Sequence, residues 1–254
     1  MLNEEADKLI SLKSDINALF NSPVLGYNSK DDIVYQFWAN RDSHEVYYFD
    51  PKTDYAPTTA ISSISWDDPN FPNIEGFGVW AAKCNFTMGP DGKMYSRMLG
   101  GNLVRIDVEN ARGENLTNGD LVGTKDGSAY GLVFDPQDEN VFYFSNNDKH
   151  CIYKYDLRTK ECACWAGQEG KSGYLDGPIG QAMFNKPGQM CVDSEGNIIL
   201  TDTENHCIRK ITMSTGYVST LAGKPQNSGY VNGSAEDAQF KKPLGICIDN
   251  DDVM

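Results

Sequence analysis

The stretch WAGQEGKSGYLDGPIGQAMFNKPGQMCVDSEGNI (165–198) returns as LAGKPQNSGYVNGSAEDAQFKKPLGICIDNDDVM (221–254), 56 residues further along the chain and without a gap. Twelve of the 34 aligned positions are identical. Unrelated sequence of ordinary composition would give roughly two. The same offset extends backwards, because His150, Cys151 and Ile152 return as HCI at 206–208. A fixed period of this length predicts a repeat architecture, in which equivalent residues lie one structural unit apart.

Each unit of the repeat is predicted to consist of short strands. In the best-defined unit the strands are expected at 189–193, 198–202, 206–212 and 217–223. These β-rich runs are separated by Gly, Asn, Asp and Ser, and they show no 3.6-residue apolar period. Gly196 and Asn197 are residue types that accept a positive φ, as a tight hairpin turn requires. Three or four strands in a unit of about 40 to 56 residues are typical of a β-propeller blade.

Earlier segments fit the same template less closely. Strand pairs are expected at 93–97 with 102–108, and at 31–38 with 44–53. The fold class is therefore predicted to be all-β, with a β-propeller of four-stranded blades over residues 31–254 and a short N-terminal helix. About four blades and the start of a fifth at Phe240 are counted. Because Met254 aligns with Ile198, where a strand begins, we expect an incomplete propeller whose full form has about six blades.

Residues 1–30 differ from the rest and are expected to form a helical lead-in. Leu9, Leu12, Ile16 and Leu19 recur at roughly helical spacing, and acidic residues precede them, where the helix dipole favours negative charge. The apolar positions are interrupted by polar residues and no small-residue cleavage site follows, so a signal peptide is not predicted. No stretch approaches the ~20 apolar residues of a transmembrane helix.

Composition limits the partners. The chain has 254 residues, 40% hydrophobic content and a formal net charge of −14, so it can bury the core of a single domain. The acidic balance argues against nucleic acid, whose phosphates are bound by an excess of Lys and Arg. It suits solubility, divalent cations or a basic partner.

The string FNKPGQMCVDSEGNIILTDTENHCIRKIT (184–212) resembles an NHL repeat. That pattern has an aromatic residue, Pro-Gly, an apolar run ending in Asp, a Gly-Asn turn, and then Asp-x-x-Asn-His-x-Ile-Arg. The matching residues here are Phe184, Pro187, Gly188, Asp193, Gly196, Asn197, Asp202, Asn205, His206, Ile208 and Arg209. The long Gly-rich connections resemble those of secreted bacterial members, so the resemblance implies a secreted or cell-surface full-length protein, although this chain carries no targeting segment.

The polar residues of the motif are interpreted as structural. Asp202, Asn205, His206 and Arg209 are placed around a turn between two strands, where they can satisfy loop backbone groups and pair with one another. The alternative makes His206 and its equivalent His150 metal ligands or bases. Residues at equivalent positions lie one blade apart and do not converge on one point, so the structural role is favoured.

Two carboxylates of hairpin turns receive the same interpretation. Asp193 and its equivalent Asp249 end apolar runs that lead into turns. The run DNDD at 249–252 could hold calcium, but it lacks the spaced Glu of a calcium loop.

Four of the seven cysteines also follow the repeat. Cys151 and Cys207 form one equivalent pair, and Cys191 and Cys247 form another, so these four are expected to be small buried hydrophobic residues. Cys162 and Cys164 lie two apart on a strand and could bind metal or be oxidised. No second cysteine pair or histidine cluster supports a zinc site. We therefore predict no cofactor; calcium and zinc are the alternatives.

Two functions remain once the repeated polar residues and cysteines are assigned to the blade architecture. The first is a noncatalytic binding or scaffold propeller that recognises a protein, peptide or glycan through loops on one face. Tyr174 and Tyr230, in the Gly-rich connections, are expected to pack against the adjacent blade or, if exposed, to stack on sugar rings or a peptide. Trp66 and Phe71, in the non-repeating loop 65–78, are the other candidate ligand-binding residues.

The second function is a metal-dependent enzyme that uses the central channel, as the resemblance to propeller lyases and lactonases implies. Such an enzyme needs inward-pointing His, Asp, Glu or Asn on the innermost strands. The innermost strands expected here, YGLVFD (130–135), GQMCVD (188–193) and LGICID (244–249), contain no histidine. No nucleophile-histidine arrangement is present either, so the binding function is favoured.

Overall fold

The computed structural model describes residues 87–97, 103–107, 110, 112–117 and 131–248 with their side chains, and residues 24–28, 33–39, 46–49, 57–61, 65–66 and 86 as strand backbone. The chain divides into two compact units, residues 1–115 and 116–254. Every described element is a strand except η3 (Thr203–Asn205), a single 3-10 turn. The all-β prediction is confirmed. No helix in the described part is long and apolar enough to cross a membrane.

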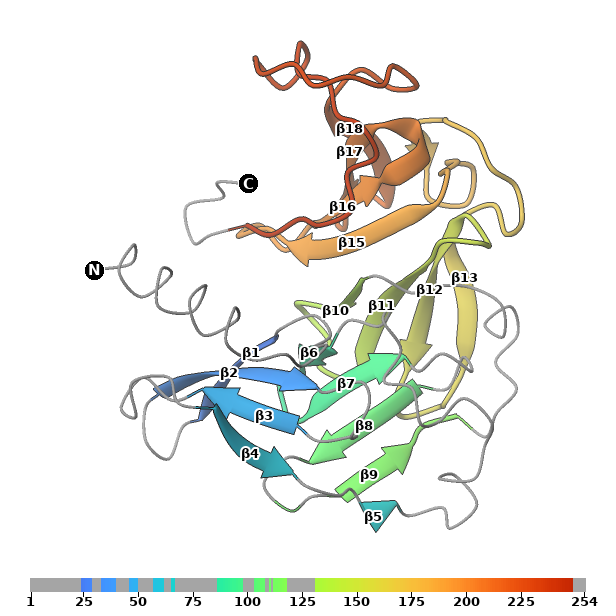
Figure 1. Cartoon of the computed structure of the whole chain (residues 1–254). Helices are drawn as coiled ribbons and strands as arrows, with labels where there is room; N and C mark the ends of the chain where they lie inside the picture. The colour runs from blue at the N-terminus through green and yellow to red at the C-terminus, as the bar shows by residue number, and fades with distance from the viewer. Residues whose placement is uncertain are drawn as a thin grey trace. The chain divides into compact units, whose positions relative to one another are not determined.

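The described strands of the first unit form two sheets (Figure 1). One is a four-stranded antiparallel meander of β1 (Val24–Asn28), β2 (Ile33–Ala39), β3 (Val46–Phe49) and β4 (Pro57–Ile61). The other comprises β5 (Ser65–Trp66), β6 (Phe86–Met88), β7 (Met94–Arg97), β8 (Leu103–Asp107) and β9 (Arg112–Asn115). Its order is β5-β9-β8-β7-β6, and β5 runs parallel to β9.

The second unit contains two further sheets. One is the antiparallel meander of β10 (Leu132–Phe134), β11 (Val141–Asn146), β12 (Cys151–Asp156) and β13 (Cys162–Gly167). The other comprises β14 (Gly177–Pro178), β15 (Pro187–Val192), β16 (Ile198–Asp202), β17 (Cys207–Thr212) and β18 (Tyr217–Ala222). Its order is β14-β18-β17-β16-β15, so the connection before β15 adds a short strand to the outer edge. All four sheets resemble propeller blades, and we call each a blade.

The strands of the best-defined unit lie where the sequence places them. β15 to β18 cover the four predicted runs, with bounds shifted by one or two residues. The predicted turn is also present, with Gly196 at φ +80° and the Asn197 N–H donating to Asp193 Oδ1 at 2.7 Å. Short polar side chains thus close the hairpin as Asx chemistry allows.

At two places the structure differs from the predicted strand boundaries. The run 244–249 was predicted as an innermost strand, but residues 244–248 form none, because no described segment pairs with them as β16 pairs with β15. At the other end β1 starts at Val24, before the boundary expected at residue 31. β1 therefore falls within the helical lead-in predicted over residues 1–30, and the helical positions Leu9 to Leu19 lie outside the described residues.

The core of the second unit joins its two blades. Apolar side chains from both sheets form one buried cluster, whose members include Val133, Tyr143, Ile152, Met190, Leu200 and Ile211. Each fully buried aliphatic or aromatic side chain of this size contributes about 1.5–3 kcal/mol. The alternation of these residues along each strand is what directs one face of each sheet into the cluster.

Candidate functional site

Arg209, on β17, is the centre of a buried polar network. Its side chain has no exposed surface. One terminal nitrogen, Nη1, donates to Asp202 Oδ2 at 2.7 Å and to the Met183 carbonyl at 3.2 Å. The other, Nη2, donates to Asp176 Oδ1 at 2.7 Å and to the Leu175 carbonyl at 2.9 Å. The planar guanidinium therefore ties the connection before β15 to the middle of the blade.

Asp202, at the end of β16, accepts hydrogen bonds from a guanidinium, a side-chain amide and a backbone N–H. Besides Arg209, it accepts the Asn205 amide at 2.8 Å and the Asn185 backbone N–H at 2.7 Å. Asn205 donates a second time, to the Gly173 carbonyl at 2.8 Å. Burial raises the pKa of Asp202 to about 6, although the Arg209 charge and these donors oppose the shift. The carboxylate is thus charged at neutral pH and depends on its partners.

Aromatic rings cover the network. The Arg209 Cζ atom lies 4.9 Å from the Tyr174 ring centroid and 5.2 Å from that of Phe184. The Tyr174 hydroxyl is 2.7 Å from Thr220 Oγ1, and the Thr220 N–H donates to Asp176 Oδ2 at 3.1 Å. Tyr174 therefore belongs to the packing between the connection and the blade.

The two repeated histidines make identical backbone contacts. His150 Nδ1 accepts the Lys186 N–H at 3.1 Å, and His206 Nδ1 accepts the Lys242 N–H at 3.2 Å. All four residues have positive φ, between 52° and 59°. Burial, followed by the Lys186 charge, lowers the pKa of His150, which favours the neutral ring that accepts this bond. His150 thereby fastens the turn that leads into β15, and His206 fastens the equivalent turn at Lys242.

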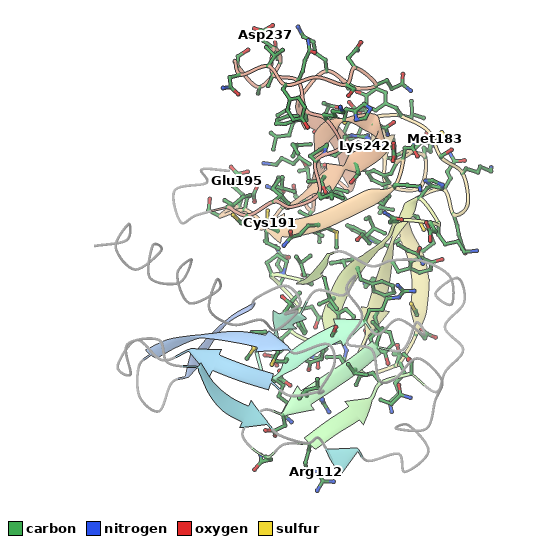
Figure 2. All side chains as sticks on the ribbon, in the orientation of Figure 1. Arg112, Met183, Cys191, Glu195, Asp237 and Lys242 are labelled. Atoms are coloured by element: carbon green, nitrogen blue, oxygen red, sulfur yellow. The ribbon has the colours of Figure 1, made fainter. Side chains whose placement is uncertain are left out.

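The remaining predicted residues lie elsewhere. Asp193 accepts from Asn197 and pairs with Lys210 at 2.9 Å, which holds the hairpin turn. Figure 2 shows Glu195 in this turn, at the opposite end of the blade from Met183 and hence from the Arg209 network.

Three predicted positions carry no side-chain description. Asp249 and Phe71 lie outside the described residues, and Trp66 is described only as backbone of β5. In the described part of the chain, no group of three or more His, Cys, Asp or Glu side chains is arranged to hold a metal.

Tyr230 differs from its repeat equivalent Tyr174. It is 83% exposed, and its ring lies 5.8 Å from the Lys241 ammonium. Val231 and Leu244 are also exposed. A groove of about 460 Å³ lies at the start of the same connection, between β18 and residues 223–236. This connection therefore presents both aromatic and aliphatic surface.

Sequence reasoning identified the motif residues but missed their partners. Asp176 and Asn185 complete the network, yet Asp176 becomes Asn232 and Asn185 becomes Lys241 in the next copy. The comparison between copies therefore gave no signal for them. The Asp-Gly pair at 176–177 marks a turn but not a contact.

The motif is also found by comparison with known families. Residues 184–211 match the NHL repeat. The chain contains an NHL repeat. Asp193, Asp202, Asn205, His206 and Arg209 all lie in the matched segment, so the resemblance is confirmed and the Arg209 network is a network of NHL motif residues.

The similarity to known proteins extends beyond the NHL motif. The chain is 25% identical over 252 residues to Protein SUPPRESSOR OF QUENCHING 1, chloroplastic, of Arabidopsis thaliana, a match that covers 91% of this chain and 23% of that protein. A solved protein of unknown function from Bacteroides thetaiotaomicron superposes with a TM-score of 0.69 at 21% identity, over 90% of this chain and 54% of that one. An auxiliary nutrient binding protein from the same organism gives a TM-score of 0.57 at 22% identity, over 92% and 65%.

These likenesses show the fold. The NHL-repeat chain spans less than a quarter of its Arabidopsis relative and about half of the first of the two Bacteroides chains.

Proposed function

We propose that this NHL-repeat chain is a noncatalytic binding propeller that recognises a protein, peptide or glycan through the loops of its blades. One observation carries the proposal: the charged pair of the motif is buried within the fold, and each repeated histidine has one ring nitrogen bonded to the backbone. Arg209 and Asp202 are completely buried and bonded to each other. Both repeated histidines use Nδ1 to accept a backbone N–H. The buried Arg209–Asp202 pair therefore has no group aimed at a substrate.

One surface available for recognition lies in the connection that carries Tyr230. Tyr230 offers an exposed ring with a hydroxyl at its edge, a combination suited to stacking and hydrogen bonding with a ligand. Neighbouring exposed Val231 adds aliphatic area.

The test uses the purified chain on peptide and glycan arrays, with lyase and lactonase assays and metal analysis in parallel. We expect saturable binding to a ligand class and no turnover. The alternative function, a metal-dependent enzyme working in the central channel, predicts the opposite. Turnover that depends on stoichiometric zinc or calcium would overturn the binding proposal.

A further inference from the structure

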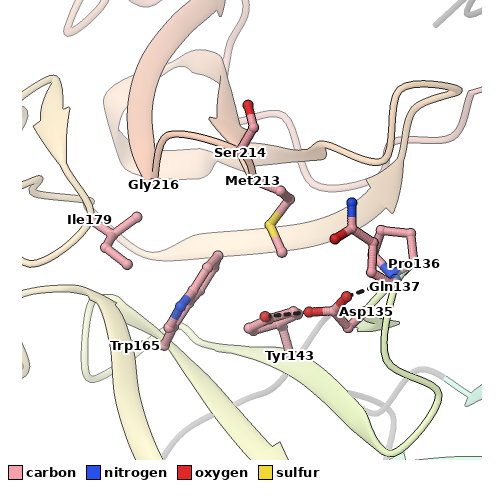
Figure 3. Close-up of a pocket in the computed structure, with 9 residues that line it drawn as sticks. All are labelled: Asp135, Pro136, Gln137, Tyr143, Trp165, Ile179, Met213, Ser214 and Gly216. Carbon is pink, nitrogen blue, oxygen red and sulfur yellow. Dashed lines mark hydrogen bonds between the residues drawn. The ribbon is translucent and has the colours of Figure 1, made fainter.

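A pocket lies between the β10–β13 blade and the β14–β18 blade, within the second unit (Figure 3). Its volume is about 290 Å³. Apolar walls come from Tyr143, Trp165, Ile179 and Met213, and the polar end comes from Asp135 and Gln137. The Tyr143 and Trp165 rings lie with their centroids 4.2 Å apart and their planes tilted by 38°. The pocket thus combines an aromatic pair with a single carboxylate.

The repeat shows that this aromatic pair is not needed to build a blade. Tyr143 corresponds to Ile199, and Trp165 corresponds to Leu221, at the 56-residue offset. The β14–β18 blade, which has the aliphatic residues at both positions, keeps the same strand order β18-β17-β16-β15 as β13-β12-β11-β10. The rings are therefore a local feature of one blade that the common strand order does not require, and in this blade Tyr143 belongs to the buried cluster and Trp165 packs against it.

The carboxylate of the pocket also departs from the repeat. Its equivalent, Asp193, pairs with Lys210 at 2.9 Å. Asp135 instead accepts the Tyr143 hydroxyl at 2.7 Å and the Gln137 N–H at 2.9 Å. Both donors are neutral, and the described residues give Asp135 no cationic partner. The negative charge at the end of the pocket is left without a countercharge from that part of the chain.

The charge of the lining residues favours a positively charged ligand. Asp135 is the one lining residue with a formal charge, and it is negative. Burial, together with the hydrogen bond to Asp135, raises the pKa of Tyr143, so its hydroxyl stays protonated and keeps donating. Ring faces attract cations within about 6 Å. A phosphate or carboxylate would meet no cationic group among the lining residues.

We infer that this pocket receives the cationic side chain of an Arg or Lys from a basic peptide segment of a partner, which names the ligand class within the proposed binding function. The methylene stem would pack on Met213 and Ile179, and the cationic head would meet the Trp165 face and Asp135. The net charge of −14 adds long-range attraction for a basic partner.

The probe is a fluorescein-labelled peptide of alternating Arg and Ser, with citrulline-Ser and Glu-Ser peptides as comparisons, titrated into the purified chain by fluorescence anisotropy. Citrulline keeps the shape of arginine but not its charge. We expect the Arg-Ser peptide to bind and the citrulline peptide to bind at least about tenfold more weakly. Equal affinity for both peptides would overturn the inference.

Two variants and a control locate the site. Asp135→Asn removes the charge but keeps an acceptor, and Trp165→Leu introduces the residue that the next copy of the repeat carries at this position. Each variant should bind the Arg-Ser peptide roughly five- to tenfold more weakly than the unmodified protein does. The control, Asp138→Asn, makes the same charge change at a carboxylate that pairs with Arg158 at 2.7 Å and does not line the pocket. It should change the affinity by less than about twofold.

The outcomes separate this inference from the proposed function. If Asp135→Asn and Asp138→Asn lower the affinity for the Arg-Ser peptide equally, the attraction is diffuse, and the assignment of the pocket as the binding site is overturned. If array ligands bind Asp135→Asn and Trp165→Leu with unchanged affinity, the pocket is not the binding site. The proposed binding function would still stand. A neutral sugar whose binding requires Trp165 would assign the pocket to a different ligand. If neither an array ligand nor the Arg-Ser peptide binds, both proposals fail. Circular dichroism checks folding, and Asp135→Asn carries the test should Trp165→Leu not fold.

Discussion

Replacing Arg209 by Tyr tests whether the NHL motif holds the blade together. Arg209 and Asp202 correspond to Tyr153 and Asn146 in the preceding blade. The double variant Arg209→Tyr with Asp202→Asn therefore installs a pair that this protein already uses in an equivalent place. The two single variants complete a double-mutant cycle, which isolates the interaction between the two positions.

The magnitudes follow from burial. Arg209→Tyr leaves the carboxylate of Asp202 without a countercharge at a site with no exposed surface, and should lower the free energy of unfolding by about 3–5 kcal/mol. Asp202→Asn should cost less, about 1–3 kcal/mol, because Arg209 keeps its pair with Asp176. The double variant should be about 2 kcal/mol more stable than the sum predicts. It should not return to the wild-type value, because a tyrosine cannot replace the hydrogen bonds that Arg209 donates to the Leu175 and Met183 carbonyls and to Asp176.

The assay is urea unfolding at neutral pH followed by circular dichroism, with hydrogen exchange over residues 173–185 as a local readout. Loss of Arg209 should release these amides first, because its guanidinium binds the carbonyls of Leu175 and Met183. A loss below about 1 kcal/mol for Arg209→Tyr, or additive single variants, would refute a structural role for the pair.

Other predictions concern stability and pH. Gly188→Ala should lower the free energy of unfolding by about 1–3 kcal/mol in urea titrations, because its Cβ would collide with a threonine hydroxyl of β16, whereas Gly180→Ala, with open space around it, should change it by less than about 0.5 kcal/mol; equal effects would contradict this packing. Tyr174→Phe should cost about 1 kcal/mol through its lost hydroxyl contact, while exposed Tyr230→Phe should be neutral in the same titration, and a reversed order would count against the assigned burial. The lowered pKa of His150 means that the unfolded chain binds the proton more readily, so the contribution of His150 to stability should be full above about pH 6.5 and fall as the pH drops below it. His150→Gln should flatten that fall in thermal melts at stepped pH, and an unchanged slope would remove His150 as its source.

Sequence period and turn chemistry determine most of the described fold. The β15–β18 hairpins follow from apolar alternation and from Gly196 and Asn197 at the turn, which are local properties of the chain. The run 244–249 shows the limit of that reasoning. Its composition matches a strand, yet a strand exists only where a partner supplies a continuous series of hydrogen bonds, and the described residues supply only isolated ones, such as that from the Gln189 N–H to the Leu244 carbonyl.

The candidate site was less predictable because its contacts are nonlocal. Tyr174 and Tyr230 share the same sequence context, but Tyr174 lies over Arg209 and Tyr230 is exposed. Burial here is set by what packs on the connection. Comparison between repeats also draws attention to positions that are kept. Trp165 and Tyr143 are replaced in the next copy, and that difference was the available signal for the pocket.

The most direct test of the account compares a motif variant with a pocket variant in one binding measurement. The affinity of the Arg-Ser peptide is measured by fluorescence anisotropy for Asn205→Ala and Trp165→Leu, at a temperature where both are folded. The account predicts that Asn205→Ala, which removes donors to Asp202 and Gly173, lowers the unfolding free energy by about 1–3 kcal/mol and leaves the affinity unchanged. Trp165→Leu should lower the affinity roughly five- to tenfold. A folded Asn205→Ala protein that loses affinity, beside a Trp165→Leu protein that keeps it, would contradict the division between architecture and recognition.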